Sequence, residues 1–580
     1  MNESEVLEHH GLGRSMIGAT VRNCDLRGKL LDGINFADAK LENVRFDGAS
    51  LRGANFARAE IQACSFAAAN LEDARFDGAV LAGVDLREAK ANRARLDDVK
   101  SVALFADRAD LRASSVRRGS FPGAKFVGAR FDASTLEESA FVGADLTGAD
   151  LSDTTVTRSA FVRATLGGVV FGSASLTAAA FMQADLRGAD LSAARLAQCA
   201  FIGANLVGAK LPRELAGCQF TRARLASRDA PIDGMAPDAE GEDAALPSFQ
   251  GADLEAASFE GLNLSGADLR DAKLTHCNLA NCDLTGANFA GANLRLAVFV
   301  GAKLRGVDFS GRDLELTVLS GADLTGANFS GARLHLNSAD GANFSEANFE
   351  RASLSKVVLR GASLDGVQFD GALLERVDFD GVDVSPIKFQ GLSLVRCTFR
   401  ELDLAGRDFS QCDLTTASFA GAKLTGATFG RALLAGTNFE GAVLDGATFT
   451  EARGKGAHFA KASLKAARFE RAGLRFAAFS YADATGANFS GADMRNCILT
   501  DAVADKARFI DAKLANADLS HASIRHADLS GADLSGVNVH NVKDQDASYT
   551  RATTTKIRKT DIDRLEAEAW IPPAKPTSYP

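Results

Sequence analysis

Lys455, Arg475 and Arg495 are three basic residues spaced by twenty positions, and Lys465 and Arg468 lie between them. The segment 451–475 carries a net charge of +5. Like charges held close together repel one another, so a fold that gathers these side chains would favour an anionic partner, such as an acidic protein or a phosphate group. The alternative is a solvated basic face with no partner. We call Lys455, Arg475 and Arg495 the basic ladder.

A second charged region is the acidic segment, residues 226–247, which holds three prolines, six acidic residues and one arginine. This composition predicts a disordered acidic loop or linker. Its carboxylates include Asp238, Glu240, Glu242 and Asp243, which form a second candidate partner surface. Unpaired ends of two separate rods would be adhesive edges. We therefore favour a loop that leaves a continuous stack, while a hinge between two rods stays open.

The residue types that usually catalyse reactions or bind metals are not grouped in this chain. The eight histidines are scattered, and no phosphate-binding loop, nucleophile elbow or zinc-protease helix is present. Each of the nine cysteines lies two positions before a recurring large residue, which predicts small buried side chains rather than ligands or disulfides. We expect no catalytic, metal or cofactor-binding residues, and no enzyme.

The spacing that places these side chains is a repeat of five residues. From Phe249 to Val539 an apolar residue, usually large, falls at every fifth position for 59 consecutive positions, which we call centres. The residue two before each centre is small, and the two after it are polar or glycine, as in Ala322-Asp323-Leu324-Thr325-Gly326. A helix with about 3.6 residues per turn does not hold this period, and neither does a flat strand. A short fixed period over hundreds of residues predicts a solenoid.

Columns of centres twenty residues apart share their chemistry, which predicts four units per coil and a square cross-section. In the column that starts at Phe249, thirteen of sixteen centres are Phe, and in the column from Leu254 thirteen of fifteen are Leu. Rungs should lie about 4.8 Å apart, as in a sheet. The expected core includes Phe289, Phe309, Phe329, Phe349, Phe369, Phe389 and Phe409, with Leu254, Leu274 and Leu294.

The units Ala287-Asn288-Phe289, Ala322-Asp323-Leu324 and Ala532-Asp533-Leu534 resemble those of the pentapeptide-repeat family. The resemblance covers most of the chain. It implies an all-β fold, a right-handed quadrilateral β-helix. Some members of that family resemble a DNA duplex and bind type II topoisomerases, so the resemblance also implies a possible DNA-mimicking modulator of DNA gyrase.

The repeat pattern divides the chain into five segments. Residues 1–15 are an N-terminal cap or disordered, 16–225 form a first tract, 226–247 are the acidic segment, 248–549 form a second tract, and 550–580 contain a cap. Phenylalanine walls change place between Phe76 and Phe121, so we predict one unit looped out within 97–110; a plain exchange of walls is the alternative. The phase slips by one residue at Pro212.

The C-terminal segment predicts a helix from Asp561 to Trp570, because Thr560 and Asp563 resemble a capping box. We expect this helix to lie over the last coil with Trp570, the only tryptophan, as the plug, followed by a flexible tail. A filled square section of this kind would leave no pocket of ligand size.

The charge distribution bears on function. The net charge is −9, of which residues 226–250 contribute −5, so the coils are close to neutral. A DNA mimic needs a strongly negative rod. We therefore expect a non-enzymatic rod-like scaffold that binds protein partners, with a secretion-linked or effector role as a variant, and keep topoisomerase binding as the alternative. No membrane span, small-molecule substrate or signal peptide is predicted, which suggests a cytoplasmic protein; non-classical secretion and the oligomeric state stay open.

Overall fold

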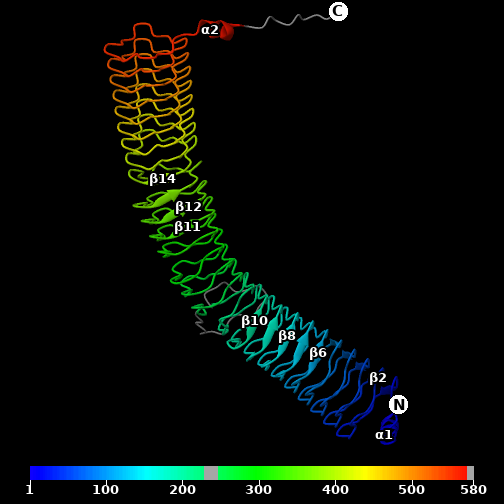
Figure 1. Cartoon of the computed structure of the whole chain (residues 1–580). Coiled ribbons are helices and arrows are strands. Elements are labelled where there is room, and N and C mark those ends of the chain that lie inside the picture. Colours follow the sequence, from blue (N-terminus) through cyan, green and yellow to red (C-terminus); the bar gives the residue numbers. More distant parts are fainter. Residues whose placement is uncertain (227–245, 571–580) are drawn as a thin grey trace, which may run out of the picture. The chain divides into compact units, whose positions relative to one another are not determined.

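A computed structural model describes residues 1–226 and 246–570 (Figure 1). The chain forms two compact units, Met1–Val307 and Asp308–Pro580, and each is described by itself. Both are right-handed quadrilateral β-helices with parallel pairing between successive coils, as predicted. The acidic residues Asp238, Glu240, Glu242 and Asp243 lie outside the described residues, and so does the end of the chain from residue 571.

The strands are three residues long, and each sheet lies on a single wall of the solenoid. The first sheet of unit 1 contains β1 (Thr20–Arg22), β2 (Lys40–Glu42), β3 (Glu60–Gln62), β4 (Val80–Ala82) and β5 (Lys100–Val102). The second contains β6 (Ser115–Arg117), β7 (Thr135–Glu137), β8 (Thr155–Thr157), β9 (Ser175–Thr177) and β10 (Arg195–Ala197). Unit 2 has β11 (Arg333–His335), β12 (Ser353–Ser355), β13 (Leu373–Glu375) and β14 (Ser393–Val395).

Each coil contains twenty residues, because bridges join residues twenty apart, as in Asp25 to Arg45 and Asp413 to Leu433. The residue two after most centres adopts a left-handed backbone conformation, which turns the chain through the corner; Gly28 with φ 64° is an example. Glycine adopts this conformation at low cost, so most of the chain's 54 glycines are found there. The glycine content therefore follows from the corners.

In the core, phenylalanine rings stack on one another from coil to coil. In unit 2 the rings of Phe329 and Phe349 are parallel, with centroids 4.6 Å apart, and those of Phe409 and Phe429 are 5.2 Å apart. Rings from opposite walls meet edge to face, as Phe409 and Phe419 do at 5.3 Å. Both arrangements are favourable for aromatic pairs. All ten residues of the expected core are buried.

On the wall that carries the second sheet, a buried hydroxyl group takes the place of an ordinary corner contact. In an ordinary corner the N–H three residues after the centre donates to the carbonyl of the centre, as Ala39 does to Phe36 at 3.1 Å. After β6 the Gly119 N–H instead donates to Ser139 Oγ at 3.1 Å, and Ser139 donates to the Val116 carbonyl at 2.9 Å. The hydroxyl thus pairs two backbone groups that would otherwise be buried without partners.

The predicted loop within 97–110 is wrong. Bridges from Lys100 to Ser120 and from Phe105 to Lys125 keep the twenty-residue spacing through this stretch. Phenylalanine and aliphatic walls simply exchange, which the core tolerates because total volume is nearly kept. The exchange leaves a small cavity of about 10 Å³ whose lining includes Leu104, Ala106 and Phe126.

Coils stack directly across the undescribed residues 227–245. Beyond Pro212 the bridges from Ala200 to Gln219 join residues nineteen apart, which agrees with the one-residue slip in phase. Glu214 then pairs with Asp253, and the rings of Phe220 and Phe259 stack with centroids 5.1 Å apart. Residues on the two sides of the acidic segment therefore belong to neighbouring coils of one unit, which favours the loop over the hinge.

The two helices lie at the ends of their units (Figure 1). Helix α1 (Glu3–Gly11) starts at Asn2, which forms a capping box with Glu5, and it buries Val6 completely. Helix α2 (Ile562–Ala569) starts at Asp561, whose side chain accepts the Arg564 N–H, so the expected capping box at Thr560 is wrong. Among the described residues, no helix has the length and apolar character needed to cross a membrane.

Trp570 does not plug the last coil. Its side chain is 67% exposed, and α2 has no buried residue. A hollow of about 590 Å³ remains at this end of unit 2, lined mainly by apolar residues that include Leu529, Leu534 and Val539. The expectation that the fold leaves no pocket of ligand size is therefore wrong here, because the final coil has no further coil above it and α2 lies beside it.

Candidate interaction surface

The basic ladder lies on one wall of unit 2. The Gly436 N–H donates to the Lys455 carbonyl at 3.0 Å, the Gly456 N–H to the Arg475 carbonyl at 2.8 Å, and the Phe476 N–H to the Arg495 carbonyl at 3.1 Å. Lys455, Arg475 and Arg495 thus occupy the same position in three successive coils. Their role in binding a partner stays a prediction.

Phe476 lies beside the first two rungs of the ladder. Its ring centroid is 5.9 Å from Lys455 Nζ and 5.7 Å from the central carbon of the Arg475 guanidinium. Both cations are attracted by the negative face of the ring, which offsets part of their mutual repulsion. The side chain is 49% exposed, because residue 476 is a left-handed corner that points away from the core.

The charge of Arg495, the third residue of the basic ladder, is already neutralised. Arg495 donates from Nε and from a terminal nitrogen to the two oxygens of Asp493, at 2.8 and 2.6 Å. This paired guanidinium is the main reason that the pKa of Asp493 is lowered. Lys465 and Arg468 are also paired, with Asp483 at 3.5 Å and Glu470 at 3.1 Å.

Lys455 and Arg475 differ from these neighbours, since they form no ion pair with any residue that the structure describes. Together with Phe476 they form what we call the cation–aromatic patch, which combines two exposed charges with an exposed ring. Such a patch can bind a carboxylate or phosphate by charge and a flat or apolar group by stacking.

The aromatic part of the patch was missed from the sequence, although a signal was present. Phe476 and Tyr481 occupy consecutive corners, both with φ 61°, where glycine is the most frequent residue. Tyr481 is 63% exposed. A large aromatic residue at a corner cannot point into the core, so the five-residue phase alone predicts an exposed ring.

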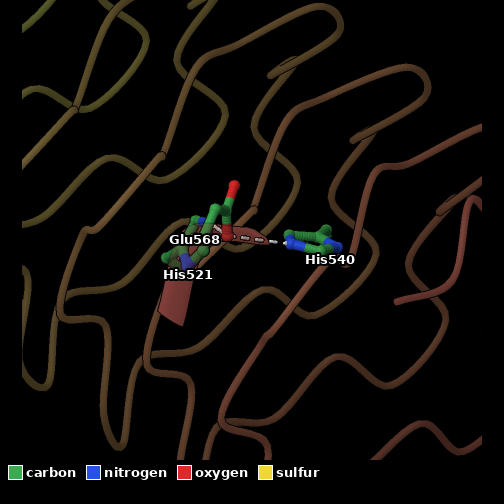
Figure 2. Close-up of side chains that lie close together, drawn as sticks. All are labelled: His521, His540 and Glu568. Atoms are coloured by element: carbon green, nitrogen blue, oxygen red, sulfur yellow. Dashed lines mark hydrogen bonds and ion pairs between the residues drawn. The ribbon is translucent and has the colours of Figure 1, made fainter. Parts of the chain in front are cut away.

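A second group of side chains was also missed. His521, His540 and Glu568 converge at the C-terminal end of unit 2 (Figure 2), although they are remote in sequence. The histidines belong to the coils and the glutamate to α2, so only the docking of the helix brings them together. The nine cysteines, in contrast, are all buried and free, as predicted.

Comparisons with known proteins agree with the fold. Two family models, both described as pentapeptide repeats, match the chain; one matches residues 124–161, 179–213, 248–336, 339–383 and 393–541, and the other matches 46–90. No curated protein that was searched matches the chain.

Among solved structures the chain is similar to HetL, a pentapeptide repeat protein involved in heterocyst differentiation regulation in Nostoc sp. strain PCC 7120. The identity is 24% over 44% of this chain and 89% of HetL, with a TM-score of 0.13. Rfr23 from Cyanothece 51142 is 24% identical over 30% and 85%, with a TM-score of 0.14. Full-length QnrB1, a plasmid-mediated fluoroquinolone resistance protein, is 13% identical over 54% and 100%, with a TM-score of 0.08. Scores this low give no basis for inferring function.

Proposed function

This chain belongs to the pentapeptide repeat family, and on that premise we propose that it is a non-enzymatic interaction protein that binds an acidic or phosphate-bearing protein partner through the cation–aromatic patch. The supporting observation is that Lys455 and Arg475 flank the exposed ring of Phe476 and form no ion pair with a described carboxylate, while Lys465, Arg468 and Arg495 do.

The rest of the solenoid supports a scaffold role. Its walls are regular, its core is filled by stacked side chains, and backbone groups are paired from coil to coil. A rigid wall of this kind presents side chains at fixed spacing, so the backbone loses little conformational entropy on binding. The acidic segment is the second proposed contact region, for a partner of opposite charge.

The experiment is affinity capture from bacterial lysate followed by mass spectrometry, with the intact chain beside Lys455→Glu/Arg475→Glu/Phe476→Ser. A partner that uses the patch should be retained by the intact chain and lost from the variant. Its binding should also weaken as salt rises, because exposed charges are screened.

The matched control is Arg508→Glu/Lys513→Glu, which makes the same charge change at two exposed positions of unit 2. Capture by this control but not by the patch variant supports the proposal. Equal capture by all three proteins would place the contact elsewhere, and a chain without residues 227–245 then tests the acidic segment.

The topoisomerase alternative receives no support from the charges of the coils. Six carboxylates that precede a centre pair with the arginine that follows it, which neutralises part of the negative charge that a DNA mimic would need. These pairs are Asp25–Arg27, Asp85–Arg87, Asp110–Arg112, Asp185–Arg187, Asp268–Arg270 and Asp493–Arg495. A supercoiling assay with purified gyrase tests this alternative directly, and inhibition at stoichiometric protein would restore it.

A further inference from the structure

The side chains of His521, His540 and Glu568 meet where α2 lies against the last coils of unit 2 (Figure 2). His521 is a corner residue, His540 follows the centre Val539 in the next coil, and Glu568 projects from the last turn of α2. We propose that these three side chains bind a zinc ion, which fastens α2 to the solenoid.

The two nitrogen–oxygen distances fit the ligand spacing of zinc. The Nε2 atoms of His521 and His540 each lie 3.2 Å from Glu568 Oε2, and all three atoms lie within 4.8 Å of one another. Tetrahedral zinc with bonds of about 2.0–2.1 Å holds its ligand atoms roughly 3.3 Å apart. Two imidazoles and one carboxylate are an established donor set for zinc, and a solvent molecule would complete the coordination.

The carboxylate is prepared for this role by its other contact. Arg564 Nε donates to Glu568 Oε1 at 2.7 Å, which leaves Oε2 directed at the two imidazoles. His540 is 2% exposed and His521 is 23% exposed, so the site is enclosed on one side and open on the other.

The position of the proton on the His540 ring determines what must change when zinc binds. The Asp561 N–H donates to His540 Nδ1 at 3.1 Å, so the neutral ring carries its proton on Nε2, from which it donates to Glu568. Zinc at Nε2 requires this proton to move to Nδ1, and the Asp561 N–H must then turn away from the ring. Zinc binding therefore changes the start of α2.

His521 requires a smaller change. Its Nδ1 lies 3.1 Å from the side-chain nitrogen of Asn541. Rotation of this amide by a half turn presents its oxygen instead, which accepts a proton on Nδ1 while Nε2 binds zinc.

The weak attachment of α2 indicates what the metal would do. The helix has eight residues and buries none of them, and isolated helices of this length are marginal in water. A metal that joins one helical residue to two coils would hold the helix in place. We therefore expect hydrogen exchange in residues 561–570 to slow when zinc is added.

The experiment is isothermal titration of zinc into the untagged, chelator-treated full chain, with hydrogen exchange measured on the same samples. The test variants are His521→Ala and Glu568→Gln, which leave the buried His540 in place. The control is His526→Ala, a neighbouring corner histidine that is 55% exposed and faces Asp546 rather than α2.

We expect one saturable zinc site per chain, weakened at least tenfold in both test variants and unchanged in the control. Protection of residues 561–570 should rise with zinc in the intact chain and in the control alone. The proposal is overturned if no saturable binding is found, since the three groups would then be only a hydrogen-bonded contact. It is also overturned if all four proteins bind zinc equally, which would indicate surface histidines acting singly.

Discussion

At the scale of single residues, the position two after a centre determines which side chains point away from the core, although its sequence varies. Glycine is by far the most frequent residue there because the left-handed conformation suits it, although arginine, alanine, aspartate and asparagine also occur. When a large residue takes the position, its side chain is forced outward, as for Phe476 and Tyr481. Candidate contact residues in this fold can therefore be found by listing bulky corner residues.

The cysteines provide a residue-scale prediction. Burial raises the pKa of Cys497 to about 12, and it also raises the pKa of Cys277. A raised pKa keeps the thiol protonated at pH 8, where an exposed cysteine would be partly thiolate. Since all nine cysteines are also buried, we expect a thiol reagent at pH 8 to label none of them rapidly in the native chain, and all nine after unfolding.

Cys24 is the informative exception, since its sulfur lies 3.5 Å from the Met1 carbonyl at the N-terminal end. Fraying of α1 should expose it first, so slow labelling should be found at Cys24 by peptide mapping. Rapid native labelling of Cys277 or Cys497 would contradict the buried positions described for them.

At the scale of elements, Pro386 interrupts the regular corners of unit 2. It lies two after the centre Val384, but its ring fixes φ near −65° and it has no N–H to donate. The bridge pattern lapses at residues 382–384 and 387–389, and the Arg407 guanidinium donates to the Ser385 carbonyl instead.

Pro386→Asn should repair this corner, because asparagine tolerates the left-handed conformation and restores the N–H. One recovered hydrogen bond is worth about 1 kcal/mol, or roughly a fivefold gain in local protection. Hydrogen exchange over residues 381–410 is the measurement, with Ser385→Asn as the control that keeps the proline. Unchanged or faster exchange in Pro386→Asn would show that the corner is not limited by the proline.

Helix α2 yields a second prediction at this scale. Trp570 is the only tryptophan and is 67% exposed, so its fluorescence should resemble that of a free indole and be fully quenched by acrylamide. Trp570→Ala should change the free energy of unfolding by less than about 0.5 kcal/mol, as for other exposed positions. Blue-shifted, protected emission would instead favour the plug expected from the sequence.

At the scale of the whole molecule, the five-residue phase continues across the acidic segment. Leu225 and Phe249 are consecutive centres separated by nineteen extra residues, which equals the length of 227–245. Their neighbours already pair across this gap, as Gln219 does with Ser258.

Removal of residues 227–245 should therefore restore a spacing of five and leave the solenoid folded, while the net charge changes from −9 to −4. We expect an unchanged circular dichroism spectrum and thermal midpoint. Removal of 226–247 leaves one residue, Ser248, between the two centres and should disrupt the coil, so it is the matched control. Loss of structure in the shorter deletion would mean that the segment itself supports the stack.

The sequence analysis was most accurate for features that depend directly on the spacing of the five-residue repeat. The coil length, the stacked Phe columns and the slip at Pro212 followed from spacing, because each depends on contacts between residues twenty apart. The loop within 97–110 was wrong, since a change of residue type in a column was mistaken for a change in chain path. Walls of similar volume can exchange without any shift in the backbone.

By itself the sequence determined the solenoid, its four-sided coil and its buried cysteines. In a periodic chain the same residue types occupy the same positions many times, so their small conformational and burial preferences add up. Only the tertiary structure decided how α2 docks, that His521, His540 and Glu568 meet, and that Phe476 contacts Lys455 and Arg475. These contacts occur once and join side chains outside the repeat's inward positions. Each contact contributes about 1 kcal/mol. Because each occurs only once, the periodic sequence pattern does not predict it.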